Sequence, residues 1–132
     1  MKVSGFTLID SMITIFIDAV LSVIAYPSYR QYILVSHRVE AKMMLMNVAN
    51  QEEQFFLQAG HYASLNKLGF VLSENDLLTE HGFYAVSVDL INNGYVLTAT
   101  ISGVQKADTD CQVLTLTQDN KKTSYPSMDC WE

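Results

Sequence analysis

The hydrophobic and polar positions of this 132-residue chain fall into three successive patterns. An almost unbroken apolar run covers residues 5–26, with Asp10 and Asp18 as its charged residues. Apolar spacings of three and four follow as far as Ala59, and alternation of period two begins at Phe83. The first pattern suits a helix that crosses a bilayer, because about 20 apolar residues span its hydrocarbon layer. The second predicts an amphipathic helix, and the third predicts β-strands.

The apolar run contains features that a plain anchor lacks. Carboxylates are costly inside a bilayer, so Asp10 and Asp18 each require an explanation. Pro27 cannot donate an amide hydrogen and crowds the preceding turn, so we expect it to kink or locally melt the helix without ending it. Three tyrosines near the proline suit either a membrane–water interface or packing against neighbours: Tyr26, Tyr29 and Tyr32.

The second part of the helix carries two neighbouring apolar rows. One row is Val39, Met43, Met46, Ala49 and Phe56, and the other is Ala41, Leu45, Val48, Phe55 and Ala59. We expect this arc to be buried, with its methionines filling the core rather than forming a soft binding surface. We expect His37 and the acid pair Glu52–Glu53 to face solvent. Gly60 is the predicted C-terminal stop.

Beyond the helix, residues 64–82 show no clear period, and Ser73–Asp76 looks like a turn within this connecting loop. Strands are predicted for residues 83–90, 95–101, 111–117 and, more briefly, 122–124. Asn92-Asn93-Gly94 predicts a hairpin between the first two. A sheet with one apolar face must bury that face, and the helix over 39–59 is the partner of suitable length. The predicted fold class is therefore α+β, with one long helix whose second half lies on an antiparallel sheet of about four strands.

The opening residues resemble the start of a type IV prepilin. The resemblance rests on Lys2, the stretch Gly5-Phe6-Thr7-Leu8-Ile9, the acid Asp10, the apolar run and Tyr26-Pro27-Ser28-Tyr29. In that family a dedicated peptidase cuts after the glycine and methylates the new N-terminal residue. The resemblance implies cleavage between Gly5 and Phe6 and an N-methyl group on Phe6. It also implies that Asp10 pairs with a Phe6 ammonium group on a neighbouring subunit and sets the register of assembly.

This sequence departs from the family at both acids. The family normally has glutamate at the first acidic position, so Asp10 is one methylene shorter. Asp18 has no family counterpart, and it is either a second polar contact within the helix bundle or a tolerated change. A secretory signal peptide and an uncleaved anchor are the alternatives to a prepilin, although no A-x-A-like site follows the run.

The resemblance divides the chain into a leader (1–5), an apolar helix (6–29) and a globular head (30–132). Two later stretches support it. The polar-aromatic stretch Glu53–Phe56, followed by Gly60-His61-Tyr62, is similar to the end of the long helix in many pilins. The tail Asp129-Cys130-Trp131 resembles that of one group of minor pilins.

Charge and cysteines narrow the range of functions. The formal net charge of −6 argues against a nonspecific grip on nucleic-acid phosphates, so nucleic acid is not an expected partner. An even count of two cysteines near the end of an exported chain predicts one disulfide, Cys111–Cys130, with two free thiols as the alternative. Closing this loop should stabilise the fold by about 3 kcal/mol.

No sequence motif points to catalysis. A phosphate-binding loop, zinc-ligand spacing and a GxSxG elbow are all missing from the sequence, and the three histidines are scattered. Asp108-Thr109-Asp110 resembles part of a calcium loop without its remaining ligands. We therefore expect no enzyme activity, no cofactor and no metal.

The sequence predicts a structural subunit of a type IV pilus, with a minor pilin favoured. By resemblance its partners are the membrane, a prepilin peptidase, an inner-membrane assembly platform and other pilin subunits. The head would lie in the periplasm before assembly and on the extracellular pilus afterwards, serving adhesion, twitching motility or DNA uptake. The alternatives are a pseudopilin of a type II secretion system, a DNA-binding competence pilin and, more remotely, a membrane-anchored enzyme.

Overall fold

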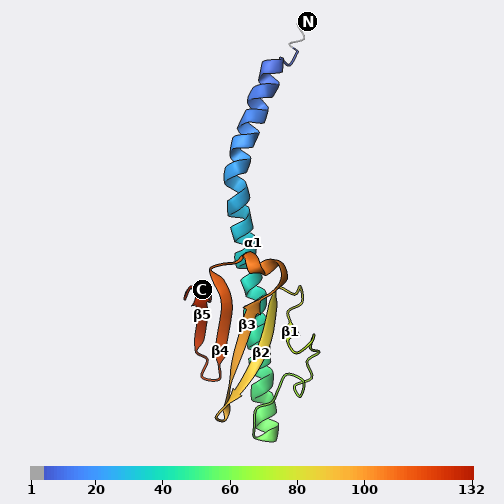
Figure 1. Cartoon of the computed structure of the whole chain (residues 1–132), viewed down its shortest axis with the longest axis vertical. Coiled ribbons are helices and arrows are strands. Elements are labelled where there is room, and N and C mark those ends of the chain that lie inside the picture. The colour runs from blue at the N-terminus through green and yellow to red at the C-terminus, as the bar shows by residue number, and fades with distance from the viewer. Residues whose placement is uncertain (1–4) are drawn as a thin grey trace. The chain divides into compact units, whose positions relative to one another are not determined.

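The structure, a computed structural model, describes residues 5–132 and consists of two compact units, Met1–Ile33 and Leu34–Glu132. Lys2 of the leader motif lies outside the described residues. One helix, α1 (Leu8–Ala59), contributes to both units (Figure 1). Its helical backbone is unbroken at Pro27, so of the two expected effects local melting does not occur, and the kink stays a prediction.

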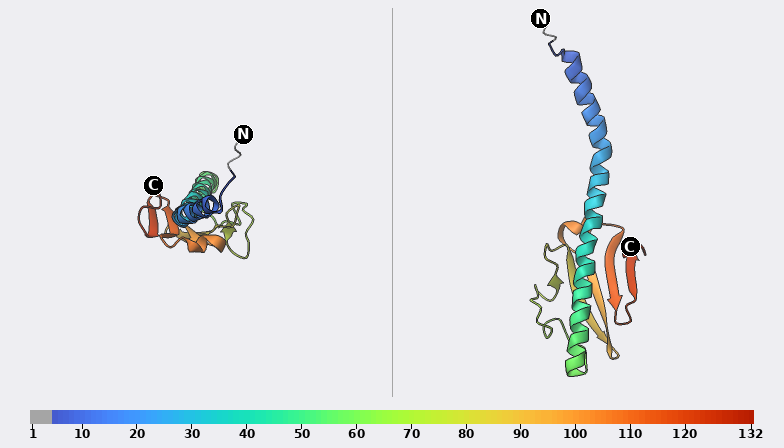
Figure 2. Two further views of the ribbon diagram at one scale, coloured as in Figure 1. Left: turned by 90° about the horizontal axis from the view of Figure 1, so that it is seen from above. Right: turned by 180° about the vertical axis from the view of Figure 1, so that it is seen from behind.

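The second unit contains a five-stranded antiparallel sheet in the order β1-β2-β3-β4-β5. Its strands are β1 (Leu77–Leu78), β2 (Tyr84–Ile91), β3 (Gly94–Ile101), β4 (Cys111–Thr117) and β5 (Lys122–Pro126). A 3₁₀ helix, η1 (Gly103–Ala107), lies between β3 and β4. The part of α1 in this unit runs along one face of the sheet (Figure 2). The predicted α+β fold is confirmed, and β1 is the strand that the sequence pattern did not indicate.

Local chemistry explains the helix end and the first hairpin. The amide of Gly60 donates to the carbonyl of Phe56 at 2.8 Å, and its φ of +74° stops α1 at Ala59 as predicted. Asn92 and Asn93, both with positive φ, connect β2 to β3, where Ile91 pairs with Gly94. Asparagine tolerates this left-handed backbone, which matches the twist of the paired strands.

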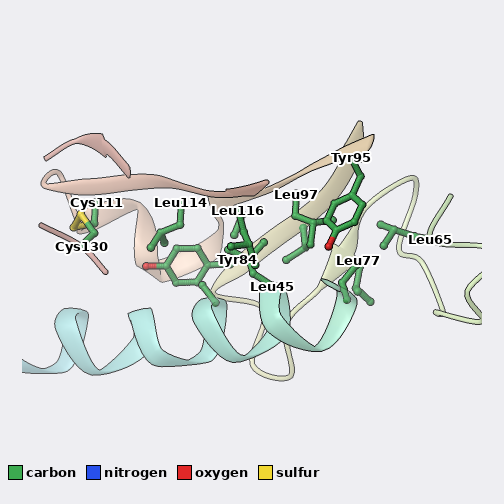
Figure 3. Packing of buried hydrophobic residues seen from close by; sticks show 14 of the residues in the cluster. Leu45, Leu65, Leu77, Tyr84, Tyr95, Leu97, Cys111, Leu114, Leu116 and Cys130 are labelled. Carbon is green, nitrogen blue, oxygen red and sulfur yellow. A yellow bond between two sulfur atoms is a disulfide. The ribbon is translucent and has the colours of Figure 1, made fainter. Parts of the chain in front are cut away.

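The core lies between α1 and the sheet (Figure 3). Ala41, Leu45 and Val48 on α1 are fully buried against the inward-facing residues of the strands. Those residues alternate along each strand and include Tyr84, Val86, Tyr95, Leu97, Ala99, Leu114 and Leu116. The disulfide joins Cys111 at the start of β4 to Cys130 in the tail, with a Cα–Cα distance of 5.9 Å, as predicted.

Most of one predicted apolar row lies outside this core, although Ala49 of that row packs against it. Val39, Met43 and Met46 are exposed, whereas the neighbouring row supplies the buried residues. Val39, Met43 and Met46 lie about 100–160° around the helix axis from Leu45, which turns them away from the buried face of α1. The prediction that these methionines fill the core is therefore wrong for Met43 and Met46, although Met44 packs against the core.

Candidate functional site

The first unit presents an apolar helix surface that the described residues 5–132 leave exposed. Every residue from Gly5 to Tyr32 is exposed. Within residues 5–132, α1 is the one helix long and apolar enough to cross a membrane by length and composition. The exposed large side chains are spread around the helix and are not confined to one stripe. They include Leu8, Ile9, Ile13, Phe16, Ile17, Val20, Leu21 and Ile24. A helix that is apolar all round is stable in lipid or among other apolar helices, not in water.

The residues of the predicted cleavage site lie just before this helix. Gly5 and Phe6 are exposed and have no helical backbone, and α1 begins at Leu8. Asp10 Oδ2 accepts hydrogen bonds from the Thr7 amide (3.0 Å) and the Thr7 hydroxyl (2.8 Å), and the Asp10 amide donates to Thr7 Oγ1 (3.4 Å). This reciprocal arrangement is a capping box, with aspartate in the place of the usual glutamate.

A buried polar cluster connects α1 to η1 and the loop after it. Arg38 binds Asp108 through two hydrogen bonds of 2.8 Å, and the Asp108 side chain is almost fully buried. The hydrogen bond to Asp108 raises the pKa of Arg38. Gln105, also fully buried, donates to the Leu34 carbonyl at 2.9 Å and to the Tyr84 hydroxyl at 3.2 Å. Burial raises the pKa of Tyr84 to about 12, so this hydroxyl stays protonated at neutral pH.

One prediction fails within this cluster. His37 is not a solvated residue, because its Nδ1 lies 2.9 Å from Gln105 Oε1 and its ring stacks on Phe83 at 3.7 Å. Asp108 is engaged by Arg38 and is therefore unavailable as the first ligand of a calcium loop. Within the described part of the chain, no group of three or more metal-ligating side chains comes together.

The acid pair near the end of α1 also differs from its prediction. Glu52 is fully buried, and its Oε2 accepts the Ala63 amide at 3.0 Å. Its Oε1 is buried without a hydrogen-bond partner among residues 5–132. Burial raises the pKa of Glu52. Glu53 is exposed as predicted, but it accepts hydrogen bonds from the hydroxyls of Tyr62 (3.2 Å) and Tyr95 (3.4 Å).

A second ion pair holds the segment before β2 against α1. His81 Nδ1 lies 2.8 Å from Glu40 Oε2, and the His81 amide donates to Glu40 Oε1 at 3.0 Å. The hydrogen bond with Glu40 raises the pKa of His81. Burial raises the pKa of Glu40, but hydrogen bonds from Thr79 and His81 outweigh it and leave the pKa below its ordinary value.

The C-terminal tail packs against β5 and α1. The Trp131 indole donates to the Thr123 carbonyl at 2.8 Å, and Lys122 Nζ lies 5.4 Å from the Trp131 ring. Lys42 Nζ donates to the Glu132 carbonyl at 3.1 Å. Burial, followed by the charges of Arg38 and Lys122, lowers the pKa of Lys42. This corner of the head therefore gathers several cations.

Comparison with known proteins identifies the family. A family model described as "Type IV minor pilin ComP, DNA uptake sequence receptor" matches residues 27–115. The chain belongs to this family. It is therefore a type IV minor pilin by descent, and the resemblance seen at the N-terminus is confirmed by a match that lies almost entirely outside the N-terminal motif.

Two further proteins are similar to this pilin. A "Fimbrial protein" of Neisseria meningitidis serogroup A is 34% identical over 98 residues, which cover 74% of this chain and 55% of that relative. The pilin thus spans about half the length of the curated relative it matches. A type IV pilin structure from Shewanella oneidensis superposes with a TM-score of 0.53 at 20% identity, covering 75% of this chain and 98% of that one. The latter likeness shows the fold alone.

Family membership explains the apolar helix and indicates how this chain assembles in general terms. Pilins are structural proteins that assemble with other pilin subunits, and the long apolar helix is consistent with membrane anchoring before assembly. The cleavage at Gly5–Phe6, the methylation of Phe6 and the role of Asp10 stay predictions. Sequence reasoning missed Glu52, Gln105 and the Arg38–Asp108 pair, because nothing in the local pattern indicates partners that lie 11 residues away for Glu52 and about 70 residues away for the others.

Proposed function

We propose that this minor pilin is an assembled subunit of a type IV pilus, held in the inner membrane by the apolar part of α1 before it joins the fibre. The observation that carries the proposal is the contrast in burial along one helix. Leu21 is 60% exposed within a largely apolar stretch, whereas Leu45 on the same helix is completely buried. A largely apolar helix that residues 5–132 leave exposed needs lipid or other apolar helices around it.

The maturation step follows from the same region. We assign the scissile bond to Gly5–Phe6, with N-methylation of Phe6 by the prepilin peptidase and handling by an inner-membrane assembly platform. The exposure of both residues and their position before the first helical turn support this assignment. The Asp10 carboxylate lies within the capping box, next to the position of the new N-terminus, where it can also meet an ammonium group of a neighbouring subunit.

Sheared fibres test this proposal directly. Pili would be sheared from cells, and their subunits analysed by mass spectrometry. We expect this chain in the fibre, substoichiometric to a major pilin, with N-methylated Phe6 as its first residue. A chain that retains Met1, or one released into the periplasm after removal of everything before Tyr29, would contradict it.

A second candidate function is DNA capture at the pilus surface, which the family description favours. Local chemistry offers one place for phosphate contacts, the corner formed by Lys42 and Lys122 beside Trp131. Lys121 precedes Lys122 in the sequence. The overall charge opposes this function, because residues 34–132 contain twelve of the fourteen acids and six of the eight basic residues. Lys121 and Lys122 also lie outside the part matched by the family model.

Duplex binding discriminates these possibilities. The purified chain in detergent would be titrated into labelled duplex DNA at about 0.15 M salt, where a nonspecific grip is weak. If the corner binds phosphate, Lys121→Ala with Lys122→Ala should weaken binding and reduce the salt dependence by about one unit per lysine. Lys67→Ala, an exposed lysine in the connecting loop, is the matched control. Undetectable binding would leave adhesion or twitching motility as the roles of the pilus, to be tested with a deletion strain.

A further inference from the structure

A pocket opens between the C-terminal end of α1 and the hairpin that connects β2 to β3. Both features lie at the same end of the head (Figure 1). The turn after α1, residues 60–62, lines one side of the pocket, and residues 90–94 of the hairpin line the other. Its volume is about 360 Å³, within the range of about 300–1,000 Å³ that is usual for small-ligand sites. We call it the hairpin pocket.

Apolar side chains form part of both sides of the hairpin pocket. On the α1 side, the rings of Phe56 and Tyr62 stack with their centroids 4.7 Å apart, and Phe56 is partly exposed. The Tyr62 hydroxyl donates to Glu53 at 3.2 Å, which fixes the position of the buried tyrosine ring. On the hairpin side, Leu90 and Ile91 are both exposed. These surfaces suit a ligand that has an apolar face.

Hydrogen-bonding groups lie in the two turns beside these apolar side chains. The Nδ1 atom of His61 lies 3.0 Å from the Ala59 carbonyl oxygen, which can only accept. Nδ1 therefore carries a proton, and Nε2 of the neutral ring is an acceptor. Asn92 and Asn93 are exposed, and each side-chain amide has two donor hydrogens and one acceptor oxygen. The hairpin pocket can thus donate to hydroxyl groups of a ligand and accept from them.

Charge narrows the class of ligand further. Within the described residues 5–132, no Asp, Glu, Lys or Arg lines the hairpin pocket. Proteins recognise carboxylate and phosphate groups chiefly with arginine and lysine, so the hairpin pocket lacks the side chains that an anionic ligand requires. The net charge of −6 also opposes the approach of an anion. These features favour an uncharged ligand.

We propose that the hairpin pocket binds an uncharged saccharide. A pyranose ring has an apolar face of C–H groups and hydroxyl groups around its edge. The face matches the Phe56 side of the hairpin pocket, and the hydroxyl groups match His61 and the two asparagines. A purely apolar ligand would make no use of these polar groups. The inference goes beyond the proposed function, because it gives the head a ligand that does not depend on assembly into a fibre.

A titration followed by NMR tests the proposal on the full chain, in a detergent without a sugar headgroup. The probes are the methyl β-glycosides of glucose, galactose and N-acetylglucosamine, with methyl β-glucuronide as an anionic counterpart of the glucoside. We expect at least one uncharged glycoside to give saturable shifts of the side-chain amide signals of Asn92 and Asn93. The glucuronide should bind more weakly than the glucoside.

Two variants locate the binding site. Asn93→Gly removes an amide and keeps the positive φ of the turn, so the affinity should fall about 5-fold, as for one lost hydrogen bond. Asn120→Gly is the matched control, because Asn120 also has positive φ but lies in the β4–β5 turn, and it should bind normally. Phe56→Ala should weaken binding about 10-fold through the loss of the aromatic surface. The unfolding midpoint verifies that each head is folded.

Several results would overturn the proposal. They are the absence of saturable shifts with all three uncharged glycosides, tighter binding of the glucuronide than of the glucoside, and unchanged affinity in the folded Asn93→Gly variant. Self-association that shifts the same amide signals without sugar would assign the hairpin pocket to a second copy of this chain. The titration needs no pili, so a chain that binds a glycoside but is absent from fibres contradicts the proposed function alone. A chain present in fibres that binds none contradicts only the saccharide site.

Discussion

The two units of this pilin carry similar apolar side chains, but these side chains are exposed in the first unit and form part of the core in the second. Residues 8–33 and residues 34–59 belong to one continuous helix, and both contain leucine, valine and methionine among their apolar residues. In the first stretch these side chains are exposed, and in the second a single face is buried against the sheet. Hydrophobicity thus predicts that a side chain will be covered, but not by what. For residues 34–59 the cover is the chain's own sheet, and for residues 8–33 it must come from outside.

The same contrast recurs around the helix within the head. Leu45 and Met46 are adjacent in the sequence, yet the first is completely buried and the second is exposed. Substitutions in matched pairs can therefore test whether each surface serves the stability of the head or its contacts with other molecules. Unfolding of the head can be followed by the fluorescence of Trp131, with the chain in detergent.

The largest effect is expected from breaking the ion pair that holds α1 to the loop before β4. Asp108→Ala removes the acceptor that the partly buried Arg38 shares with the fully buried Gln105. Such a loss costs about 3–5 kcal/mol. The expected result is a decrease of this size in the free energy of unfolding, measured by chemical denaturation. Asp89→Ala, which removes an exposed carboxylate from β2, should change it little, and equal effects of both variants would refute the role of the cluster.

The comparison between units is tested by the same substitution in each. Leu45→Ala opens a cavity in the core and should destabilise the head by about 3 kcal/mol. Leu21→Ala removes an exposed side chain of the first unit and should leave unfolding of the head unchanged, while weakening retention in membranes or pili. Fractionation of cells measures the second effect. A destabilised head in the Leu21 variant would break the distinction drawn between the units.

A smaller, pH-dependent effect is expected at Glu52. Its pKa is raised in the folded state, so ionisation opposes folding, and the penalty is complete only above the raised pKa. The penalty disappears as the pH falls towards the ordinary value of 4.5. Each unit of pKa difference corresponds to about 1.4 kcal/mol.

The measurement at Glu52 is a difference between variants, because Glu40 and His81 also titrate. Glu52→Gln removes the ionisation, so the gap in unfolding free energy between wild type and variant should depend on pH between 4.5 and 8. The exposed Glu74→Gln serves as control and should give no such dependence. If the difference in unfolding free energy stays constant over this range, ionisation of Glu52 does not destabilise the folded head.

The smallest effect is expected at the start of α1. Thr7→Ala removes the hydroxyl that accepts a hydrogen bond from the Asp10 amide and donates one to the Asp10 carboxylate. Losing an N-cap residue costs about 1 kcal/mol of helix stability. Amide hydrogen exchange of residues 8–11 in micelles should become faster, with no change in the head. Thr14→Ala removes only a bond to the Asp10 carbonyl and should not have this effect.

Local patterns were enough to predict most of the fold. The end of α1 at Gly60, the asparagine turn after β2 and the boundaries of β4 follow from backbone preferences and alternation that act over a few residues. The β1 strand was missed because two residues are too short for a period and owe their conformation to pairing with β2. The Cys111–Cys130 disulfide was predicted from the number of cysteines and the expectation of export.

The sequence by itself determined that this chain has one long, largely apolar helix, a sheet that needs a partner, and the N-terminal motif of a prepilin. Only the tertiary structure decided which face of the helix meets that sheet. Both rows of α1 have helical periodicity, so the choice depends on long-range packing, including the pairing of Arg38 with Asp108 and the burial of Glu52 over Ala63. Helical spacing specifies which residues share a face, whereas the elements folded against the helix select the face that is buried.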